Sequence, residues 1–128
     1  MLQTLQSTII KGKQLGRKLG FPTANLDPIF IDISNVESGV YAGLIEIDSL
    51  NGKFKAAVSI GLNSTFDQAN FTVEAYILDF DQDIYGKKVR LELVAKIREM
   101  QKFESVDELI EQIKSDVNAV NQILNQGK

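Results

Sequence analysis

The chain has 128 residues, 44% of them hydrophobic, which predicts one globular domain over residues 1–128 with a continuous core. It has no cysteine and no histidine, which excludes disulfides, histidine bases and the usual zinc sites and leaves carboxylates, lysines or tyrosines for proton transfer. The net charge of −3 argues against nucleic acid as a partner, and the absence of a long apolar run or signal-peptide pattern predicts a cytoplasmic protein that does not enter a membrane.

The first feature along the chain is a glycine-rich segment, GKQLGRKLGFPTAN, from Gly12 to Asn25. Gly12, Gly16 and Gly20 would let backbone amides approach an anion, and four nearby cations would neutralise it: Lys11, Lys13, Arg17 and Lys18. The spacing matches neither a Walker A loop nor the dinucleotide-binding GxGxxG motif. The segment therefore predicts a phosphate-binding loop on a different scaffold, and a solvated basic loop is the alternative that charge alone favours equally.

The glycine segment ends in the tetrapeptide PTAN. Pro22 fixes its own φ and restricts Phe21 to extended conformations. If the following residues are extended, Thr23 and Asn25 share one face. Hydroxyl and amide oxygens suit a hard ion such as magnesium brought in by a nucleotide. The alternative for an isolated tetrapeptide is a turn in which both side chains only satisfy local backbone groups.

A surface loop is expected from Asp27 to Ser38, and then the pattern changes to strands. Four runs with strand character follow between Gly39 and about Arg98: GVYAGLIEI, FKAAVSIG, FTVEAYILDF and VRLELVAKIR. The Asn51-Gly52 pair predicts a hairpin because both residues tolerate positive φ, and a second turn is expected at 81–86. In the last run five apolar residues are expected to form one buried face: Val89, Leu91, Leu93, Ala95 and Ile97. This organisation predicts an antiparallel barrel or sandwich.

The third of these strands carries a carboxylate. Its apolar residues are Phe71, Val73, Ala75 and Ile77, so Glu74 lies on the opposite face with Thr72 and Tyr76. A carboxylate in this position could accept a proton from a hydroxyl group. The pattern alone fits an ordinary solvated strand residue better.

A helix is predicted after Ser105, because Ser105 and Glu108 have the spacing of a capping box. The helix carries one apolar stripe and Gly127 is placed to end it. We expect the stripe to cover the barrel wall or one open end rather than to await a partner. Its members are Val106, Leu109, Ile110, Ile113, Val117, Val120 and Leu124.

Six segments in this order resemble the riboflavin kinase family: GRKLGFPTANL, GVYAG, AVSIG, TVEAY, DFDQDIYGKKV and IREMQKFES. The resemblance covers nearly the whole chain, and PTAN after the glycine loop is its most specific part. It implies a mainly β fold, a six-stranded antiparallel Greek-key barrel with a C-terminal amphipathic helix. It also implies that the protein transfers the γ-phosphate of ATP to the 5′ hydroxyl of riboflavin, giving FMN.

The resemblance also implies roles for individual residues. Thr23 and Asn25 would hold magnesium and phosphate, and Glu74 would be the general base. Arg98 to Phe103 would form a flap over the flavin, with Phe103 packed on the ring and Arg98 donating hydrogen bonds to it. Phe103 has an equal alternative role as a hydrophobic staple before the Ser105 cap. The nucleotide side would comprise Gly12, Gly16 and Arg17 in the phosphate loop and Tyr85 with Gly86 near adenine.

Four positions depart from the family pattern. Ser64 replaces a proline, Tyr76 a histidine, Met100 an acidic residue and Ser7 a glycine. These departures motivate an alternative function, a flavin-binding regulatory or assembly module with weak or no kinase activity. Most bacterial members join the kinase to an N-terminal FAD synthetase domain that depends on a histidine motif. A chain without histidine is then either an excised kinase module or a free-standing kinase, and it does not make FAD.

Overall fold

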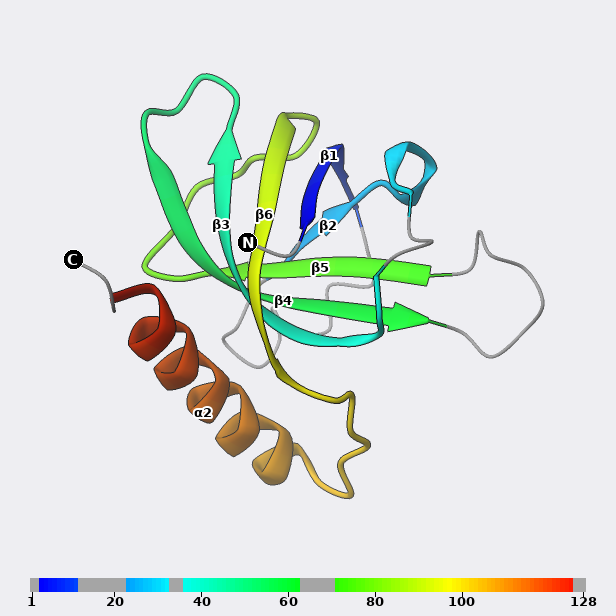
Figure 1. The fold of residues 1–128 in the computed structure, drawn as a ribbon, viewed down its shortest axis with the longest axis vertical. Coiled ribbons are helices and arrows are strands. Elements are labelled where there is room, and N and C mark those ends of the chain that lie inside the picture. The colour runs from blue at the N-terminus through cyan, green and yellow to red at the C-terminus, as the bar shows by residue number, and fades with distance from the viewer. Residues whose placement is uncertain (1–2, 12–22, 33–35, 63–70, 126–128) are drawn as a thin grey trace.

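The computed structural model describes residues 3–11, 23–32, 36–62 and 71–125, and its six strands close into one barrel (Figure 1). A 3-10 helix, η1, follows the second strand, and an α-helix ends the described chain. The elements are β1 (Gln3–Ile10), β2 (Ala24–Leu26), η1 (Pro28–Phe30), β3 (Gly39–Ile47), β4 (Lys53–Leu62), β5 (Phe71–Ile77), β6 (Lys88–Arg98) and α2 (Val106–Asn125).

The strand order around the barrel is β1-β2-β5-β4-β3-β6, and every neighbouring pair is antiparallel. β3, β4 and β5 are consecutive neighbours, and β6 returns to lie beside β3. This is the Greek-key arrangement. The predicted fold class, a six-stranded antiparallel barrel with a C-terminal helix, is confirmed.

Alternation along the strands fills the barrel interior. On β5, Phe71, Val73, Ala75 and Ile77 are buried, whereas Glu74 is only partly covered. The predicted apolar face of this strand is therefore confirmed, and Glu74 lies on the outer face of the barrel wall. Among the largest fully buried side chains are Leu26, Ile45, Ile60, Leu91 and Leu93.

The end of β6 departs from simple alternation. Gly43 of β3 pairs with Leu93, but Val40 pairs with Arg98, so three residue steps on β3 face five on β6. The two register shifts are β-bulges, which bend a strand and re-aim its side chains. The single buried face predicted for this strand is therefore wrong beyond Leu93, and Ile97 packs instead in the cluster beneath α2. Arg98, the last residue of β6, is also re-aimed and contacts α2.

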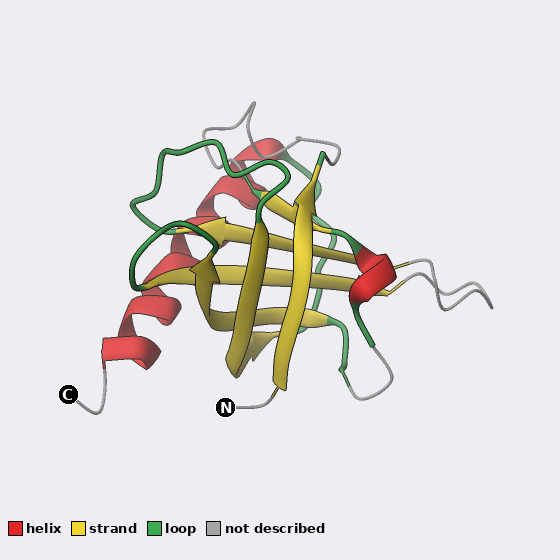
Figure 2. Ribbon diagram, turned by 90° about the horizontal axis from the view of Figure 1, so that it is seen from above, coloured by secondary structure: helices red, strands yellow, loops and turns green. Residues whose placement is uncertain are grey.

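α2 lies against the outside of the barrel on one side (Figure 2) and contacts β3, β4 and β6. Val120 is fully buried there with Ala42, Ala57 and Leu78. The expectation that the apolar stripe covers the barrel wall is confirmed for this part of the helix. At the start of the helix it is wrong, because Val106 is 54% exposed and precedes the contact with the sheet.

The helix begins as predicted, with one difference in the capping box. Ser105 Oγ accepts a hydrogen bond from the backbone N–H of Glu108 at 3.2 Å. Glu108 Oε2 accepts from the backbone N–H of Glu104 at 3.2 Å, one residue before the cap position. The first contact satisfies an amide that the first helical turn leaves unpaired, and the second ties the residue before the cap to that turn. Gly127, the predicted stop, lies outside the described residues.

Two connections differ from their predictions. Between β3 and β4 the positive φ angles fall on Ser49 (73°) and Gly52 (86°), so the turn starts earlier than the expected Asn51-Gly52 pair. β5 ends at Ile77, three residues before the predicted end of that run, because Asp79 has a φ of 54° that a strand cannot continue. The turn expected at 81–86 is confirmed by Gly86, whose φ is 83°.

The segment expected as a surface loop after Asp27 contains η1. Asp27 Oδ1 accepts a hydrogen bond from the backbone N–H of Ile29 at 3.1 Å, and Pro28 supplies a helical φ at the first position. Val36, later in the same segment, is buried against the core. The prediction of a surface loop therefore holds for part of this segment only.

Gly43 lies at a close approach of β3 to β6, and its replacement is expected to lower stability. A Cβ at this position would lie 3.0 Å from the carbonyl oxygen of Glu92 and 3.1 Å from Val58 Cγ2. We expect Gly43→Ala to lower the free energy of unfolding by about 1–3 kcal/mol, measured by urea denaturation. Gly61→Ala is the matched control, because its Cβ would meet only the hydroxyl of exposed Thr72 at 3.1 Å. Equal stabilities of the two variants would contradict this packing account.

Candidate active site

Three predicted site residues meet across β2 and β5. Asn25 is the direct antiparallel partner of Glu74, and residues so paired share one face of a sheet. Thr23, immediately before β2, donates a hydrogen bond from Oγ1 to Glu74 Oε1 at 3.2 Å. A threonine hydroxyl has one hydrogen, so its oxygen lone pairs remain available to a cation or another donor. All three side chains are partly buried.

A cleft of about 850 Å³ opens beside this group, within the size range of small-molecule sites. Thr23 and Asn25 line it, whereas Glu74 is not among its lining residues and is joined to it only by the hydrogen bond with Thr23. The cleft is formed by the ends of β1, β2 and β5 and by the connection between β5 and β6. Its other lining residues are Ile9, Ile10, Lys11, Ala24, Ala75, Ile77, Phe80, Asp81, Gln82, Asp83, Ile84 and Tyr85.

Tyr85 lines this cleft from a hydrogen-bonded turn. Lys87 N–H donates to Ile84 O at 3.0 Å, and Gly86, with a φ of 83°, occupies a position that favours glycine. The Gly86 N–H donates to Ile9 O at 2.9 Å, which attaches the turn to β1. The Tyr85 ring is 58% exposed and has Lys11 Nζ 5.3 Å from its centroid. An exposed aromatic face with a cation beside it suits a planar, negatively charged ligand.

The oxygen donors of the cleft fit a magnesium ion that arrives with a nucleotide. Within the described residues there is no group of three or more acidic side chains that could hold a metal by themselves. Magnesium typically takes only one or two protein ligands and completes its shell with water and substrate phosphates. Thr23 and Asn25 supply neutral oxygen donors of this kind, with the Glu74 carboxylate adjacent.

Arg98 and Phe103 form a second group, where β6 passes into α2. The Arg98 guanidinium lies 5.8 Å from the Phe103 ring centroid, which is a cation–π contact. Arg98 also forms an ion pair with Asp116 of α2 and donates from Nη1 to the carbonyl oxygen of Glu99 at 3.0 Å. Phe103, with the first turns of α2, lines a shallow depression of about 520 Å³. The structure therefore joins Arg98 to Phe103 but does not include either in the lining of the first cleft.

Asp116 is the residue of this second group that sequence reasoning missed. It had one visible signal: an acidic side chain three residues after Ile113 and four before Val120 interrupts the apolar stripe of the helix.

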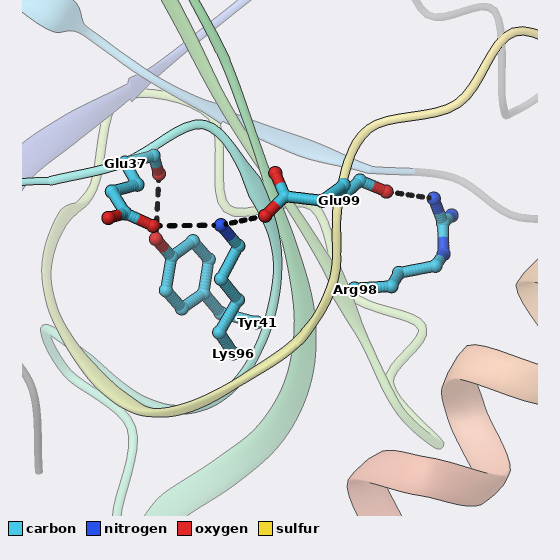
Figure 3. Close-up of polar contacts among 5 residues, drawn as sticks. All are labelled: Glu37, Tyr41, Lys96, Arg98 and Glu99. Atoms are coloured by element: carbon cyan, nitrogen blue, oxygen red, sulfur yellow. Dashed lines mark hydrogen bonds and ion pairs between the residues drawn. The ribbon is translucent and has the colours of Figure 1, made fainter.

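A polar cluster joins the segment before β3 to the end of β6 (Figure 3). Lys96 Nζ contacts Glu37 Oε2 at 2.9 Å and Glu99 Oε1 at 2.6 Å. The Tyr41 hydroxyl donates to the carbonyl oxygen of Glu37 at 2.7 Å. Hydrogen bonds to Glu99 and Glu37 raise the pKa of Lys96, and burial raises the pKa of Tyr41 although the Lys96 charge opposes that rise.

These two shifts predict a loss of stability at alkaline pH. Both groups are held protonated in the fold, so their contribution is complete below the ordinary values of 10.0 for tyrosine and 10.5 for lysine and disappears as pH rises through the folded pKa values. We expect urea midpoints to fall above about pH 10, and to fall less in Tyr41→Phe and Lys96→Met than in the parent. An unchanged pH dependence in both variants would contradict the assignment of these shifts.

The positions that depart from the family pattern have structural settings of their own. Tyr76 packs beside the apolar cluster under α2, where an aromatic ring adds apolar contact. Ser7 is buried and donates from Oγ to the carbonyl oxygen of Asp27 at 2.6 Å, which links β1 to the segment after β2. Met100, between β6 and α2, is exposed. Gly12, Gly16, Arg17 and Ser64 lie outside the described residues.

The barrel and its cleft define a small β-barrel protein that presents oxygen donors and an aromatic side chain to a ligand. The profile of the riboflavin kinase family, Flavokinase, matches residues 2–124, and the chain belongs to this family. None of the helices in the described ranges is long and apolar enough to span a membrane.

Individual relatives agree with the family profile. The chain is 42% identical over 118 residues to the RNA-binding riboflavin kinase RibR of Bacillus subtilis, covering 91% of this chain and 49% of that protein. It is 37% identical to the bifunctional riboflavin kinase/FMN adenylyltransferase of Escherichia coli, covering 88% of this chain and 35% of that protein. The riboflavin kinase structure from Trypanosoma brucei superposes with a TM-score of 0.72 at 30% identity, over 97% of this chain and 80% of that one. The chain thus spans half or less of the length of these two bacterial relatives.

Proposed function

We propose that this protein transfers the γ-phosphate of ATP to the 5′ hydroxyl of riboflavin, forming FMN and ADP. The observation that carries this proposal is the hydrogen bond of 3.2 Å between Thr23 Oγ1 and Glu74 Oε1 at the wall of a ligand-sized cleft. It joins a carboxylate to the hydroxyl and amide donors of the PTAN segment, and the chain's membership of the riboflavin kinase family gives this group its chemistry.

The nucleotide is proposed to occupy the cleft between Tyr85 and Thr23. The exposed ring of Tyr85 would contact the adenine, and Lys11 would neutralise phosphate charge. In the sequence Lys11 leads directly into the glycine segment, and Gly12, Gly16 and Arg17 are proposed as its phosphate-binding residues.

Glu74 is proposed to act as the general base. The riboflavin 5′ oxygen attacks the γ-phosphorus, its proton passes to the Glu74 carboxylate, and the bond between the γ-phosphorus and the bridging oxygen breaks to release ADP. Thr23 occupies a lone pair of Glu74 Oε1 only, and a carboxylate offers about four acceptor sites. The hydrogen bond therefore orients the base without consuming its capacity to take a proton.

Thr23 and Asn25 are proposed to hold magnesium together with the phosphates. Bound there, the ion would neutralise the charge of the transferring phosphoryl group. The side chains themselves fix where the γ-phosphate lies relative to Glu74, and in a loose phosphoryl-transfer transition state such positioning provides much of the acceleration.

The flavin is proposed to bind under the Arg98–Phe103 flap. Phe103 would pack on the isoalloxazine ring, and Arg98 would donate hydrogen bonds to its polar edge. The bifunctional relatives carry an activity named FMN adenylyltransferase, which takes FMN as its substrate. We propose that such an activity, on the parent chain or on another, consumes the product.

Incubation with riboflavin, ATP and magnesium, followed by chromatography, tests this function. FMN is the expected product, with no FAD. Riboflavin binding without FMN formation would support the alternative of a flavin-binding module. Neither binding nor product would contradict both.

A further inference from the structure

Asp116 is an unusual residue for its place in the fold. It lies in the middle of α2, on the side that faces the barrel, and is 4% exposed. Apart from Ser7, it is the sole polar or charged residue classed as buried in the parts of the chain that the structure describes. A helix needs no carboxylate to pack on a sheet, and a buried charge is unfavourable unless it is paired. Its position calls for a reason beyond packing.

Every oxygen of the Asp116 carboxylate is engaged. Oδ1 accepts from Arg98 Nε at 2.9 Å, and Oδ2 accepts from Arg98 Nη2 at 2.8 Å, so the two residues form a bidentate ion pair. Gln112, one turn earlier on α2, adds a third hydrogen bond to Oδ1 at 3.1 Å. The pair is well shielded, with side-chain exposures of 16% for Arg98 and 6% for Asp116.

The Arg98–Asp116 pair fixes the orientation of the Arg98 guanidinium, and Arg98 is also the first residue of the flap. Because two nitrogens of Arg98 are bound to one carboxylate, the plane of the group cannot turn without losing both bonds. In that plane Nη1 reaches the carbonyl oxygen of Glu99, and the cation lies 5.8 Å from the Phe103 ring. Three of the five N–H groups are thus occupied, and the rest remain for a ligand.

Buried ion pairs are weak evidence for stability, because well-packed apolar residues of similar size often serve as well. Their best-supported use is to specify one arrangement among several. Here the ion pair would specify how Arg98 and the Phe103 ring lie relative to each other.

We propose that Asp116 is a positioning residue for riboflavin, acting through Arg98 to hold the Arg98–Phe103 flap in its flavin-binding form; this inference rests on the proposed function. α2 then supports the binding site through Asp116, although the Asp116 side chain does not touch the ligand. A flap held in this way loses less conformational freedom on binding, so the gain appears as riboflavin affinity rather than as nucleotide affinity.

The test is riboflavin affinity, measured by quenching of riboflavin fluorescence without ATP, beside ADP affinity measured by calorimetry. We expect Asp116→Asn to weaken riboflavin binding on the order of tenfold and to leave ADP binding within about twofold. Asp116→Glu, which keeps the carboxylate, is expected to recover part of the loss. In an Arg98→Met background, Asp116→Asn is expected to add almost nothing, because the residue through which it acts is gone.

A milder variant and a control keep the test decisive. Gln112→Met removes the third hydrogen bond while leaving the Arg98–Asp116 pair, and is expected to weaken riboflavin binding about twofold to threefold even if Asp116→Asn fails to fold. Glu92→Gln removes the charge of Glu92 from its ion pair with Lys53, at 2.9 Å, and is expected to leave riboflavin affinity unchanged. Parental riboflavin affinity in both Asp116→Asn and Gln112→Met would overturn the inference. So would equal losses of riboflavin and ADP affinity, or additive effects with Arg98→Met.

Failure of the inference is distinguishable from failure of the proposed function. A parent protein that forms FMN while its Asp116 and Gln112 variants bind riboflavin normally removes only the positioning role. A parent protein that binds no riboflavin removes the proposed function and this inference with it.

Discussion

Thr23→Val is expected to lower kcat for FMN formation on the order of 10²–10³-fold, which is the loss seen when one well-placed polar group is removed from a catalytic site. Valine has nearly the shape of threonine but no hydroxyl, so the hydrogen bond to Glu74 disappears without opening a cavity. The change removes an oxygen donor from the cleft and releases the orientation of the proposed base. Initial rates at saturating ATP and riboflavin measure the effect.

Thr23→Ser is the matched control, because it keeps the hydroxyl and removes only a methyl group. Its kcat is expected to stay within about tenfold of the parent. A rate for Thr23→Val equal to that of Thr23→Ser would show that the hydroxyl has no role in turnover.

Glu74→Gln is expected to lower the rate of phosphoryl transfer on the order of 10²-fold, the usual contribution of a general base. Glutamine keeps an oxygen that accepts the Thr23 hydroxyl, so the geometry of the pair is preserved while its charge and basicity are lost. Affinity for ADP is expected to change by less than about twofold. Single-turnover mixing with excess enzyme measures the chemical step without product release.

Glu46→Gln provides the comparison for loss of a carboxylate elsewhere on the barrel, since Glu46 is on β3 in an outer ion pair with Lys53 at 3.7 Å. Its rate is expected to equal that of the parent. If Glu74→Gln also turned over at the parental rate, its role as base would have to be abandoned.

The strand content, and the shared face of Thr23 and Asn25, could be predicted from local pattern. Alternation of Phe71, Val73, Ala75 and Ile77 placed Glu74 on the outer face, and Thr23 and Asn25, two residues apart, share one side if the backbone there is extended. The proposal that Glu74 is the base came from the resemblance, because an outward-facing strand glutamate has no distinctive local signal. The prediction that the barrel closes also depended on the resemblance, because β2 has only three residues.

The end of β6 and its contact with α2 could not be predicted from the pattern. Bulges depend on how two strands pair, and the alternation of Leu91, Leu93, Ala95 and Ile97 in the sequence continues unbroken through them. The same bulges direct Arg98 toward α2, so its pairing with Asp116 was invisible as well. The expectation that Arg98 donates hydrogen bonds to the flavin did not include its contacts with Asp116 and with the carbonyl oxygen of Glu99.

The most direct test of the central claim is transfer of label from γ-³²P-ATP to riboflavin, with 5′-deoxyriboflavin as the control acceptor that lacks the reacting hydroxyl. The account predicts one labelled phosphate in FMN for each ADP formed, no labelled product from 5′-deoxyriboflavin, and loss of the signal in Thr23→Val. Riboflavin that binds with full fluorescence quenching but acquires no label would contradict the claim that this cleft is a phosphotransferase site.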